Sequence, residues 1–216
     1  PSNTGWTANS PKTSPPEFPM PTNSSQKVIL IRHGETEWSL SGRHTSTTDI
    51  PLTAAGEQRA ASLQSFLARR EFGLVLCSPR LRARRTCELA GFAEKAEITP
   101  DLAEWNYGDY EGLTTPEIRK SVPGWTVFTQ PCPNGETAAD VAARVDRVIA
   151  RVREAGCDTL LVGHSHCLRV LTARWLALDP LAARFFQLET GTWSQLGYEH
   201  GNPVIQAWSA PPAISA

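Results

Sequence analysis

The 216 residues are enough for one domain with a full hydrophobic core, and 40% hydrophobic and 20% charged residues are the proportions of an ordinary globular protein. A formal net charge of -1 with interspersed signs excludes a global field that would attract nucleic acid or an anionic membrane. No apolar run approaches the roughly 18 residues of a membrane span. The five cysteines form neither a CxxC pair nor a metal-ligand spacing, so we expect a protein of the reducing cytoplasm. From the charge and the lack of a long apolar run, we expect no nucleic-acid or membrane partner.

Residues 1–26 are expected to form a tail outside the folded domain. They hold six of the 17 prolines together with many Ser, Thr and Asn residues. Such a segment buries too little apolar surface to offset the entropy of ordering it. Met20 is the only methionine, so residues 1–19 are candidates for non-native sequence. The folded domain is expected over residues 27–210.

Apolar strands alternate with amphipathic helices through the rest of the chain. Strands are expected at residues 28–31, 74–77, 159–162, 193–198 and 204–208. Helices are expected at residues 54–70, at 81–90, after the capping box of Thr137 and Asp140, and at 168–177. A stretch rich in Pro and Gly at about 98–133 indicates a small lid-like insertion. The alternation predicts a three-layer α/β/α sandwich with a mostly parallel central sheet.

Three of these strands end in clusters of histidine and arginine. The clusters are Arg32-His33-Gly34, Ser78-Pro79-Arg80-Leu81-Arg82 and Gly163-His164-Ser165-His166. The carboxyl ends of parallel strands meet at one edge of a sheet, where ligands bind. Arginine offers a planar fork of donors that matches phosphate oxygens, and histidine near neutral pH serves as a nucleophile or as a proton donor. The set favours a phosphoryl group as ligand.

Five blocks in order resemble the histidine phosphatase (phosphoglycerate mutase-like) superfamily. They are Leu30 to Trp38 with the RHG signature, Asp49 to Thr53 with Gly56, Ser78 to Thr86, Glu104 to Gly112, and Gly163 to Ser165. The match spans about residues 28–208. Within the superfamily the sequence looks most similar to a branch that includes fungal sedoheptulose-bisphosphatase and mycobacterial acid phosphatases. It implies a phosphoglycerate mutase-like fold.

The resemblance also implies a role for each matching residue. His33 would be the nucleophile, and Arg32, Arg82 and His164 would form the phosphate pocket. Glu104 would protonate the leaving oxygen and then deprotonate the water that hydrolyses the phosphohistidine. Positive groups would stabilise the transferred phosphoryl group, so neither a metal nor a cofactor is expected.

Three positions are candidates for contacts with the part of the substrate that differs between members of the superfamily. Ser39 stands where many relatives have Asn, and its hydroxyl is a candidate donor to a phosphate oxygen. Arg43 and His44 fall on a loop that is expected to face the substrate beyond the transferred phosphate. For Tyr107, beside the acid, a pocket wall and simple packing are both open. His166 is interpreted as a structural residue in the first turn of a helix.

We therefore expect a phosphomonoesterase that hydrolyses a small phosphorylated metabolite, such as a sugar phosphate or bisphosphate. One alternative is a cofactor-dependent phosphoglycerate mutase, although mutases usually carry a longer insertion after the acid residue. A second alternative is a phospho-ligand binding protein without turnover, which would have no need of Glu104. The oligomeric state stays open, with a homo-oligomer among the alternatives.

Overall fold

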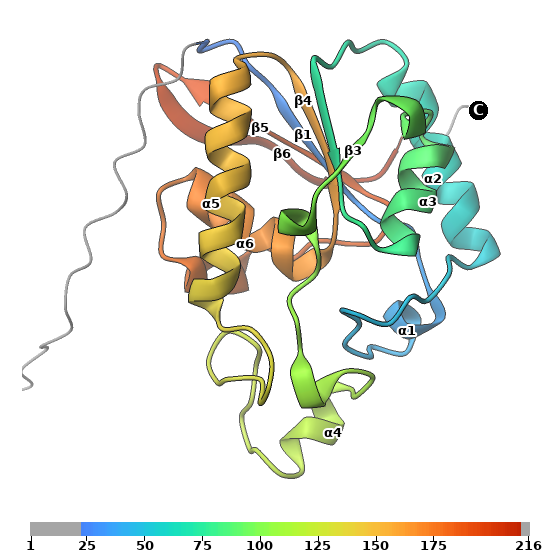
Figure 1. Ribbon diagram of the computed structural model, residues 1–216, viewed down its shortest axis with the longest axis vertical. Coiled ribbons are helices and arrows are strands. Elements are labelled where there is room, and N and C mark those ends of the chain that lie inside the picture. The colour runs from blue at the N-terminus through green and yellow to red at the C-terminus, as the bar shows by residue number, and fades with distance from the viewer. Residues whose placement is uncertain (1–22, 213–216) are drawn as a thin grey trace, which may run out of the picture.

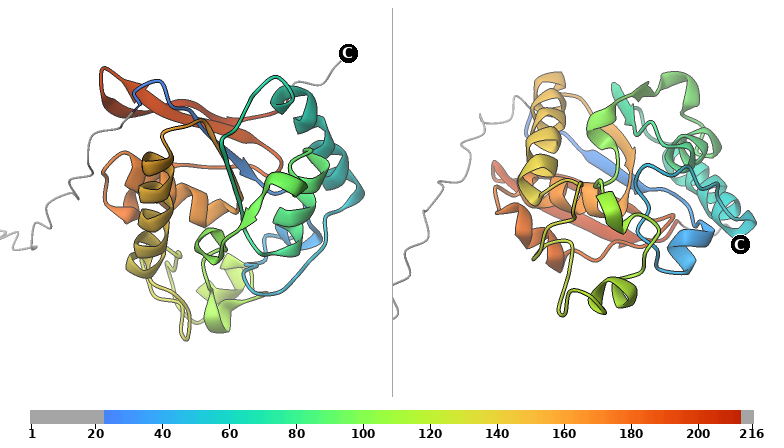
Figure 2. Two further views of the ribbon diagram at one scale, coloured as in Figure 1. Left: turned by 45° about the horizontal axis from the view of Figure 1, so that its top comes forward. Right: turned by 60° about the horizontal axis from the view of Figure 1, so that its bottom comes forward.

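The computed structural model describes residues 23–212. Most of the expected tail, including residues 1–19, lies outside the described part of the chain. Within residues 23–212 the chain forms a central sheet with helices on both faces (Figures 1 and 2). This arrangement confirms the predicted α/β/α sandwich. No helix in the described range is long and apolar enough to cross a membrane.

The sheet has six strands in the order β3-β2-β4-β1-β5-β6. The strands are β1 (Val28–Arg32), β2 (Leu74–Cys77), β3 (Glu97–Ile98), β4 (Thr159–Gly163), β5 (Trp193–Glu199) and β6 (Asn202–Ala210). The pairs β1–β4, β2–β4 and β2–β3 are parallel, whereas β1–β5 and β5–β6 are antiparallel. The centre of the sheet is therefore parallel, as predicted, and the antiparallel part is the hairpin at one side.

Helices cover both faces and the carboxyl ends of the parallel strands (Figure 1). The α-helices are α1 (Glu37–Leu40), α2 (Ala54–Leu67), α3 (Leu81–Leu89), α4 (Thr115–Arg119), α5 (Ala138–Ala155) and α6 (Ser165–Trp175). The short 3-10 helices are η1 (Ala93–Lys95), η2 (Pro100–Leu102), η3 (Gly108–Tyr110) and η4 (Pro180–Phe185). Helices α5 and α6 lie on one face of the sheet, and α2 and α3 lie on the other.

Two hydrophobic cores form because successive side chains of a strand point to opposite faces. Along β1, Val28 and Leu30 pack with the core of α5 and α6. Ile29 and Ile31 pack with the core of α2 and α3. Because all four side chains are buried, the strand is apolar throughout rather than alternating, as expected of a central parallel strand.

Helix α5 begins at the predicted capping box and ends before a glycine. The Thr137 hydroxyl accepts a hydrogen bond from the Asp140 N–H, and the Asp140 carboxylate accepts one from the Thr137 N–H at 2.8 Å. This is the predicted capping box. At the other end Gly156 has a φ of 58°, a left-handed conformation that glycine adopts without steric cost.

Helix α6 starts earlier than expected, at Ser165 rather than near residue 168. Its capping residue is His164, which makes no side-chain capping hydrogen bond. The first-turn N–H groups of His166 and Cys167 donate instead to Glu104, which is about sixty residues away in sequence. Because the cap is supplied by a distant residue, the local sequence carries no start signal.

The stretch 98–133 contains short elements that extend beyond the carboxyl ends of β2 and β4. Figure 1 shows the chain passing from β3 to α4 at the same end of the molecule as α1. Helix α4 is fixed by a capping box in which Thr114 and Glu117 bind each other's backbone N–H groups. The insertion therefore lies at the edge of the sheet where the histidine and arginine clusters are expected. Neither α1 nor β3 was predicted, and both are very short.

Candidate active site

The register of the parallel strands brings the predicted clusters to one edge. Arg32 pairs with Gly163, and Cys77 pairs with Val162. His33, Ser78 and His164 each follow directly on one of these strands, so the three polar segments begin at the same level of the sheet.

His33 is held as a neutral ring with one free nitrogen. Its side chain is 5% exposed, and its Nδ1 lies 2.7 Å from the carbonyl oxygen of Gly34. A carbonyl only accepts, so the proton is on Nδ1 and the lone pair is on Nε2. Burial holds the pKa of His33 well below its ordinary value, and the charges of Arg82 and Arg32 lower it further, although the hydrogen bond to Gly34 opposes them. An unprotonated Nε2 is the state that a nucleophile needs.

His164 lies beside His33, with 5.0 Å between the ring centroids. Its Nε2 lies 2.7 Å from the Ser78 hydroxyl, and its Nδ1 is buried without a hydrogen-bond partner among the described residues. Burial lowers the pKa of His164 well below its ordinary value, as do Arg82 and His33. The Ser78 hydroxyl can donate to Nε2 or accept from it, so this contact satisfies Nε2 in either tautomer of the neutral ring.

Arg32 and Arg82 bind backbone carbonyls through their Nη atoms, and their Nε atoms have no hydrogen-bond partner among the described residues. Arg32 Nη1 donates to the Leu188 carbonyl. Arg82 is 1% exposed and donates to the carbonyls of Thr45 at 2.9 Å and Thr48 at 3.1 Å. The Nε atoms of both arginines are buried without a partner in the described structure. Buried donors without partners are rare and call for an acceptor, which an anion supplies.

Glu104 accepts hydrogen bonds from three backbone N–H groups. Its Oε1 accepts from Trp105 at 2.8 Å and from Cys167 at 2.9 Å, and its Oε2 accepts from His166 at 3.1 Å. The side chain is 7% exposed. The N-terminus of α6 thus fixes the carboxyl group, and Oε2, with a single N–H partner, is the oxygen that is left to exchange a proton.

A cavity of about 170 Å³ lies in front of these groups. It is bounded by the end of β1, by the chain around α1, by the segment after η2 and by the first turn of α6. Its lining residues are Arg32, His33, Thr36, Ser39, Gly42, Arg43, His44, Thr45, Glu104, Tyr107, Ser165 and His166. Six of the eight predicted site residues are therefore in its wall, whereas Arg82 and His164 are not part of the lining.

Ser39 and Arg43 have protein partners at the cavity. The Ser39 hydroxyl donates to the Thr36 carbonyl and accepts from the Thr36 N–H, both at 2.9 Å, which closes the capping box of α1. Arg43 is exposed, donates to the Gly112 carbonyl at 2.5 Å and lies 3.8 Å from the Glu117 carboxylate. Ser39 thus shapes the loop through its backbone contacts, while Arg43 carries its charge at the mouth.

His44, Tyr107 and His166 form one wall of the cavity. The Tyr107 hydroxyl lies 2.6 Å from His166 Nδ1, and the His44 ring lies 4.7 Å from the Tyr107 ring. Burial lowers the pKa of His44 to about 4, against the opposing charge of Glu111, and it lowers the pKa of His166 as well. We name these three residues the neutral wall.

Tyr107 both lines the cavity and packs in the core on the side of α5 and α6, so both alternatives left open for it hold. The cavity wall also adds His166 to the site. His166 is in the first turn of α6, as the sequence predicts, but its side chain also lines the cavity. Its place two residues after His164 is the signal that could have identified it. Glu111, in contrast, accepts hydrogen bonds from Ser46 and Thr48 and so stabilises the loop.

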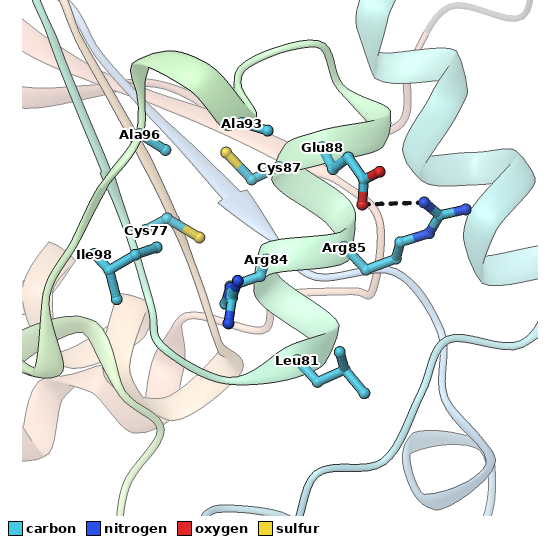
Figure 3. Close-up of a pocket in the computed structure, with 9 residues that line it drawn as sticks. All are labelled: Cys77, Leu81, Arg84, Arg85, Cys87, Glu88, Ala93, Ala96 and Ile98. Atoms are coloured by element: carbon cyan, nitrogen blue, oxygen red, sulfur yellow. Dashed lines mark ion pairs between the residues drawn. The ribbon is translucent and has the colours of Figure 1, made fainter.

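A larger cavity, of about 410 Å³, lies between α3 and β3 and contains none of the predicted site residues (Figure 3). Its lining residues are Cys77, Leu81, Arg84, Arg85, Cys87, Glu88, Ala93, Ala96 and Ile98. A hydrogen bond to Cys87, together with burial, raises the pKa of Cys77, so Cys77 is a thiol. We therefore assign the chemistry to the smaller cavity. Within residues 23–212 no group of three or more His, Cys, Asp or Glu side chains is arranged to hold a metal ion.

Gly56→Ala should destabilise the protein and impair the site, because α2 touches the loop that carries His33. A Cβ at Gly56 would lie 2.3 Å from the Glu35 carbonyl oxygen, a backbone atom that cannot rotate away. We expect a loss of about 1–3 kcal/mol in the free energy of unfolding, with reduced activity. Urea unfolding measures the loss. The exposed control Ala55→Ser should stay within about 0.5 kcal/mol of the wild type, and a Gly56→Ala variant as stable as that control would contradict the packing argument.

Stability should fall as the pH drops below about 6.5. The pKa values of the four site histidines are lowered in the folded protein, chiefly by burial, so the unfolded chain binds protons that the folded chain does not. These histidines are His33, His44, His164 and His166. Between pH 6.5 and 5.5 each ring should cost about 1 kcal/mol of unfolding free energy, which is about 4 kcal/mol for the four rings. Urea titrations at the two pH values measure the loss. His164→Gln should remove about a quarter of it, and a stability that does not fall would contradict the neutral state of the rings.

Comparison with known proteins agrees with this geometry. The chain is 42% identical over 181 residues to an acid phosphatase of Mycobacterium tuberculosis, covering 82% of this chain and 89% of the relative. It is 36% identical over 184 residues to sedoheptulose 1,7-bisphosphatase of Saccharomyces cerevisiae, covering 70% and 68%. The solved structure of an open reading frame product of Mycobacterium tuberculosis superposes with a TM-score of 0.83 at 39% identity, covering 87% of this chain and 99% of that one.

The family itself follows from the extent of the match. The sequence profile described as histidine phosphatase superfamily (branch 1) matches residues 28–211, from the first strand to the end of the last. The relatives named above are phosphatases and include both kinds that define the branch expected from the sequence. The chain is a phosphatase and belongs to the histidine phosphatase superfamily, branch 1.

Proposed function

We propose that the protein is a phosphomonoesterase that hydrolyses a small phosphorylated metabolite, a sugar phosphate or bisphosphate, through a phosphohistidine on His33. The observation that carries the proposal is the state of His33, whose Nδ1–H is bound to the Gly34 carbonyl so that Nε2 keeps its lone pair. Glu104 lines the same cavity and can serve as the acid and base that the two steps need.

In the first step His33 Nε2 attacks phosphorus opposite the ester oxygen. The N–P bond forms as the P–O bond to the leaving group breaks, and the protonated Glu104 gives its proton to the departing oxygen. The Nδ1–H bond to Gly34 keeps the ring oriented and stabilises the positive charge that develops on the imidazole. The products are the free alcohol and the phosphohistidine.

In the second step a water molecule attacks the phosphohistidine. The Glu104 carboxylate takes a proton from the water, the new P–O bond forms, and the N–P bond breaks with its electron pair returning to Nε2. Inorganic phosphate leaves and Glu104 is again protonated. One carboxyl group serves both steps because the leaving oxygen and the attacking water occupy the same side of phosphorus in turn.

Positive and hydrogen-bonding groups around His33 would stabilise the phosphoryl group during transfer. The unpartnered Nε atoms of Arg32 and Arg82 are donors in a buried setting, where electrostatic interactions are stronger than in water. In its Nδ1–H tautomer His164 would add a third donor. These groups are fixed before the substrate arrives, so little reorganisation is required when charge develops on the phosphoryl oxygens.

The rest of the cavity favours a polar leaving group of limited size. The neutral wall offers aromatic faces and uncharged hydrogen-bonding groups, which suit the C–H faces and hydroxyls of a sugar. Arg43 at the mouth carries a positive charge that a second phosphate or a carboxylate could approach. A volume of about 170 Å³ beside His33 limits the part of the substrate that can be enclosed.

A phosphate-release screen over phosphorylated metabolites tests the proposal, with the His33→Ala variant run in parallel. We expect release of inorganic phosphate from sugar phosphates or bisphosphates by the wild type, with activity unchanged by a chelator. Isomerised phosphoglycerate without free phosphate would instead identify a mutase. Activity that survives His33→Ala, or that is lost with the chelator, would overturn the mechanism.

A further inference from the structure

The ion pair between Arg144 and Glu136 lies next to the segment that carries Glu104, outside the cavity lining, and the two chemical steps do not use it. Arg144 of α5 is 8% exposed, and its Nε and Nη2 donate to the two carboxylate oxygens of Glu136 at 2.8 Å and 3.1 Å. Such a two-point pair is the strongest arrangement of these groups. Arg144 is buried and the Glu136 side chain is 23% exposed, so the cost of removing the charges from water offsets much of their attraction. The pair therefore calls for a role beyond stability.

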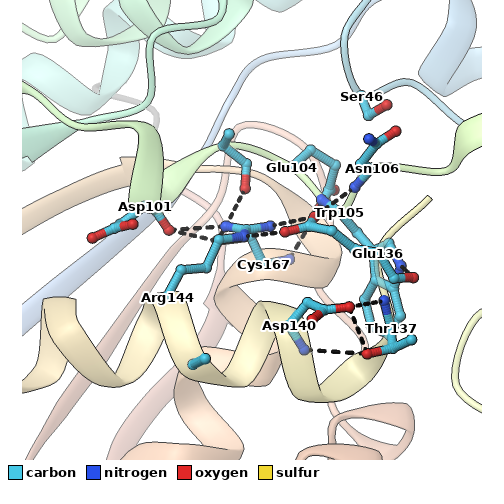
Figure 4. Close-up of polar contacts among 12 residues, drawn as sticks. Ser46, Asp101, Glu104, Trp105, Asn106, Glu136, Thr137, Asp140, Arg144 and Cys167 are labelled. Carbon is cyan, nitrogen blue, oxygen red and sulfur yellow. Dashed lines mark hydrogen bonds and ion pairs between the residues drawn. The ribbon is translucent and has the colours of Figure 1, made fainter. Parts of the chain in front are cut away.

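Arg144 holds the chain that leads into Glu104. Its Nη1 donates to the carbonyl oxygens of Asp101 at 2.8 Å and Ala103 at 2.7 Å. These residues precede Glu104 by three positions and one position and belong to no regular strand or long helix that would fix them otherwise. Figure 4 shows the guanidinium reaching from α5 to this segment.

Glu136 holds the chain that leaves Glu104. Its Oε2 accepts from the Asn106 N–H at 2.8 Å, and its own backbone carbonyl accepts from the Trp105 indole N–H at 2.8 Å. Its backbone N–H donates in turn to the Asn106 carbonyl at 2.9 Å. One ion pair thus fixes the backbone on both sides of the acid residue (Figure 4).

The same guanidinium also reaches the helix that binds the Glu104 carboxyl group. Arg144 Nη1 lies 3.4 Å from the Cys167 Sγ, and the Cys167 N–H donates to Glu104 Oε1 at 2.9 Å. Arg144 therefore contacts both the segment that carries the acid and the helix N-terminus that receives it. The position of Glu104 Oε2 relative to His33 depends on how the segment that carries Glu104 is held against the N-terminus of α6.

We propose that the Arg144–Glu136 pair is the positioning device for Glu104, so that proton transfer to the leaving group depends on it although neither residue lines the cavity. The inference rests on the proposed role of Glu104 as acid and base. Lysine at position 144 would keep the charge but could not bind Glu136 at two points and the Asp101 and Ala103 carbonyls at once. Proton transfer requires hydrogen-bond distance, so a small shift of the carboxyl group weakens it.

The test compares two substrates of similar size that differ in their need for a proton. The leaving group of p-nitrophenyl phosphate departs without protonation, whereas that of phenyl phosphate is more basic and needs the acid. For Arg144→Lys we expect kcat/KM to fall about 10–100-fold with phenyl phosphate and less than about 3-fold with p-nitrophenyl phosphate. Glu136→Gln should behave in the same way, because the amide replaces one of the two accepting oxygens of Glu136 with an NH2 donor.

Arg147→Lys is the matched control. Arg147 is on the same helix and pairs with the Asp101 carboxylate at 2.5 Å, but its side chain is 63% exposed and it donates to no backbone carbonyl of the Glu104 segment. We expect both substrates to be turned over by this variant within about 2-fold of the wild type. Circular dichroism spectra and thermal unfolding of every variant establish that the proteins compared are folded.

A double variant separates positioning from general structural damage. In a Glu104→Gln background the acid is absent, so Arg144→Lys should lower kcat/KM for phenyl phosphate by less than about 3-fold. Equal losses with both substrates in Arg144→Lys, or additive losses in the double variant, would overturn the positioning role. If Glu104→Gln alone affected both substrates equally, the proposed role of Glu104 would fail instead, so the two failures are distinguishable.

Discussion

His33→Ala should abolish turnover, with kcat/KM falling by at least about 10⁴-fold on any substrate of the wild type. The substitution removes the nitrogen that forms the bond to phosphorus, while the Arg32 and Arg82 donors stay in place. Substrate should therefore still bind, with a dissociation constant within about an order of magnitude of the wild type. Steady-state phosphate release and equilibrium binding of a phosphorylated substrate measure the two quantities.

His200→Ala serves as the control for this experiment. His200 lies in the turn between β5 and β6. Because β5 is antiparallel to β1, this turn is at the opposite end of the sheet from His33. Its replacement should leave kcat/KM unchanged. Residual activity of His33→Ala above about one hundredth of the wild type would contradict a nucleophilic role and would point to direct attack by water.

Glu104→Gln should lower kcat/KM for phenyl phosphate by about 10²–10⁴-fold and should trap the phosphoenzyme with an activated substrate. The amide can neither protonate the leaving oxygen nor accept a proton from water. With p-nitrophenyl phosphate the first step needs no acid, so p-nitrophenol should appear in a rapid burst of one equivalent. The second step still needs a base, so the subsequent steady rate should be slow. Stopped-flow absorbance follows both phases.

Asp109→Asn is a suitable companion to that variant. The Asp109 carboxylate is near Glu104 in sequence but accepts from the Asn134 amide at 3.0 Å and 3.1 Å. The variant should show neither the burst nor the loss of the steady rate. A Glu104→Gln enzyme with wild-type steady turnover and no burst would show that another group transfers the proton.

The positions of the strand-end residues could be predicted from sequence because they depend on local signals. Strand β2 is bounded by Gly73 and Ser78 and consists of four apolar residues, all buried. Its end therefore marks where the arginine cluster begins. The capping box at Thr137 likewise fixes the start of α5 without reference to any distant residue. Parallel pairing then brings these local features to one edge of the sheet.

The surroundings of Glu104 could not be predicted in the same way, because they depend on contacts between distant segments. The start of α6 depends on the Glu104 carboxyl group, and the neutral wall depends on a hydrogen bond between Tyr107 and His166. In the sequence, Arg144 is one of several arginines on a long helix. Only the folded chain shows that it is buried against Glu136 while Arg147, one turn further on, is exposed.

The division between a local and a non-local part of the site bears on specificity. In the proposed mechanism His33 and the arginines around it bind the phosphoryl group, which every substrate of such an enzyme shares. In the same proposal the neutral wall and Arg43 contact the leaving group. Relatives of this chain differ in the substrates that their names record. Substitutions in the neutral wall should therefore change the order of preference among substrates more than the rate with an aryl phosphate.

The most direct test of the proposed phosphohistidine on His33 is to trap the phosphoenzyme and locate the phosphate. The wild type and Glu104→Gln are mixed with ³²P-labelled p-nitrophenyl phosphate, quenched with base within milliseconds and digested for peptide mapping. We expect one acid-labile, base-stable phosphoryl group on the peptide that contains His33, with more label in Glu104→Gln than in the wild type and none in His33→Ala. Label on a serine or cysteine, or no label under conditions of rapid turnover, would contradict the phosphohistidine mechanism.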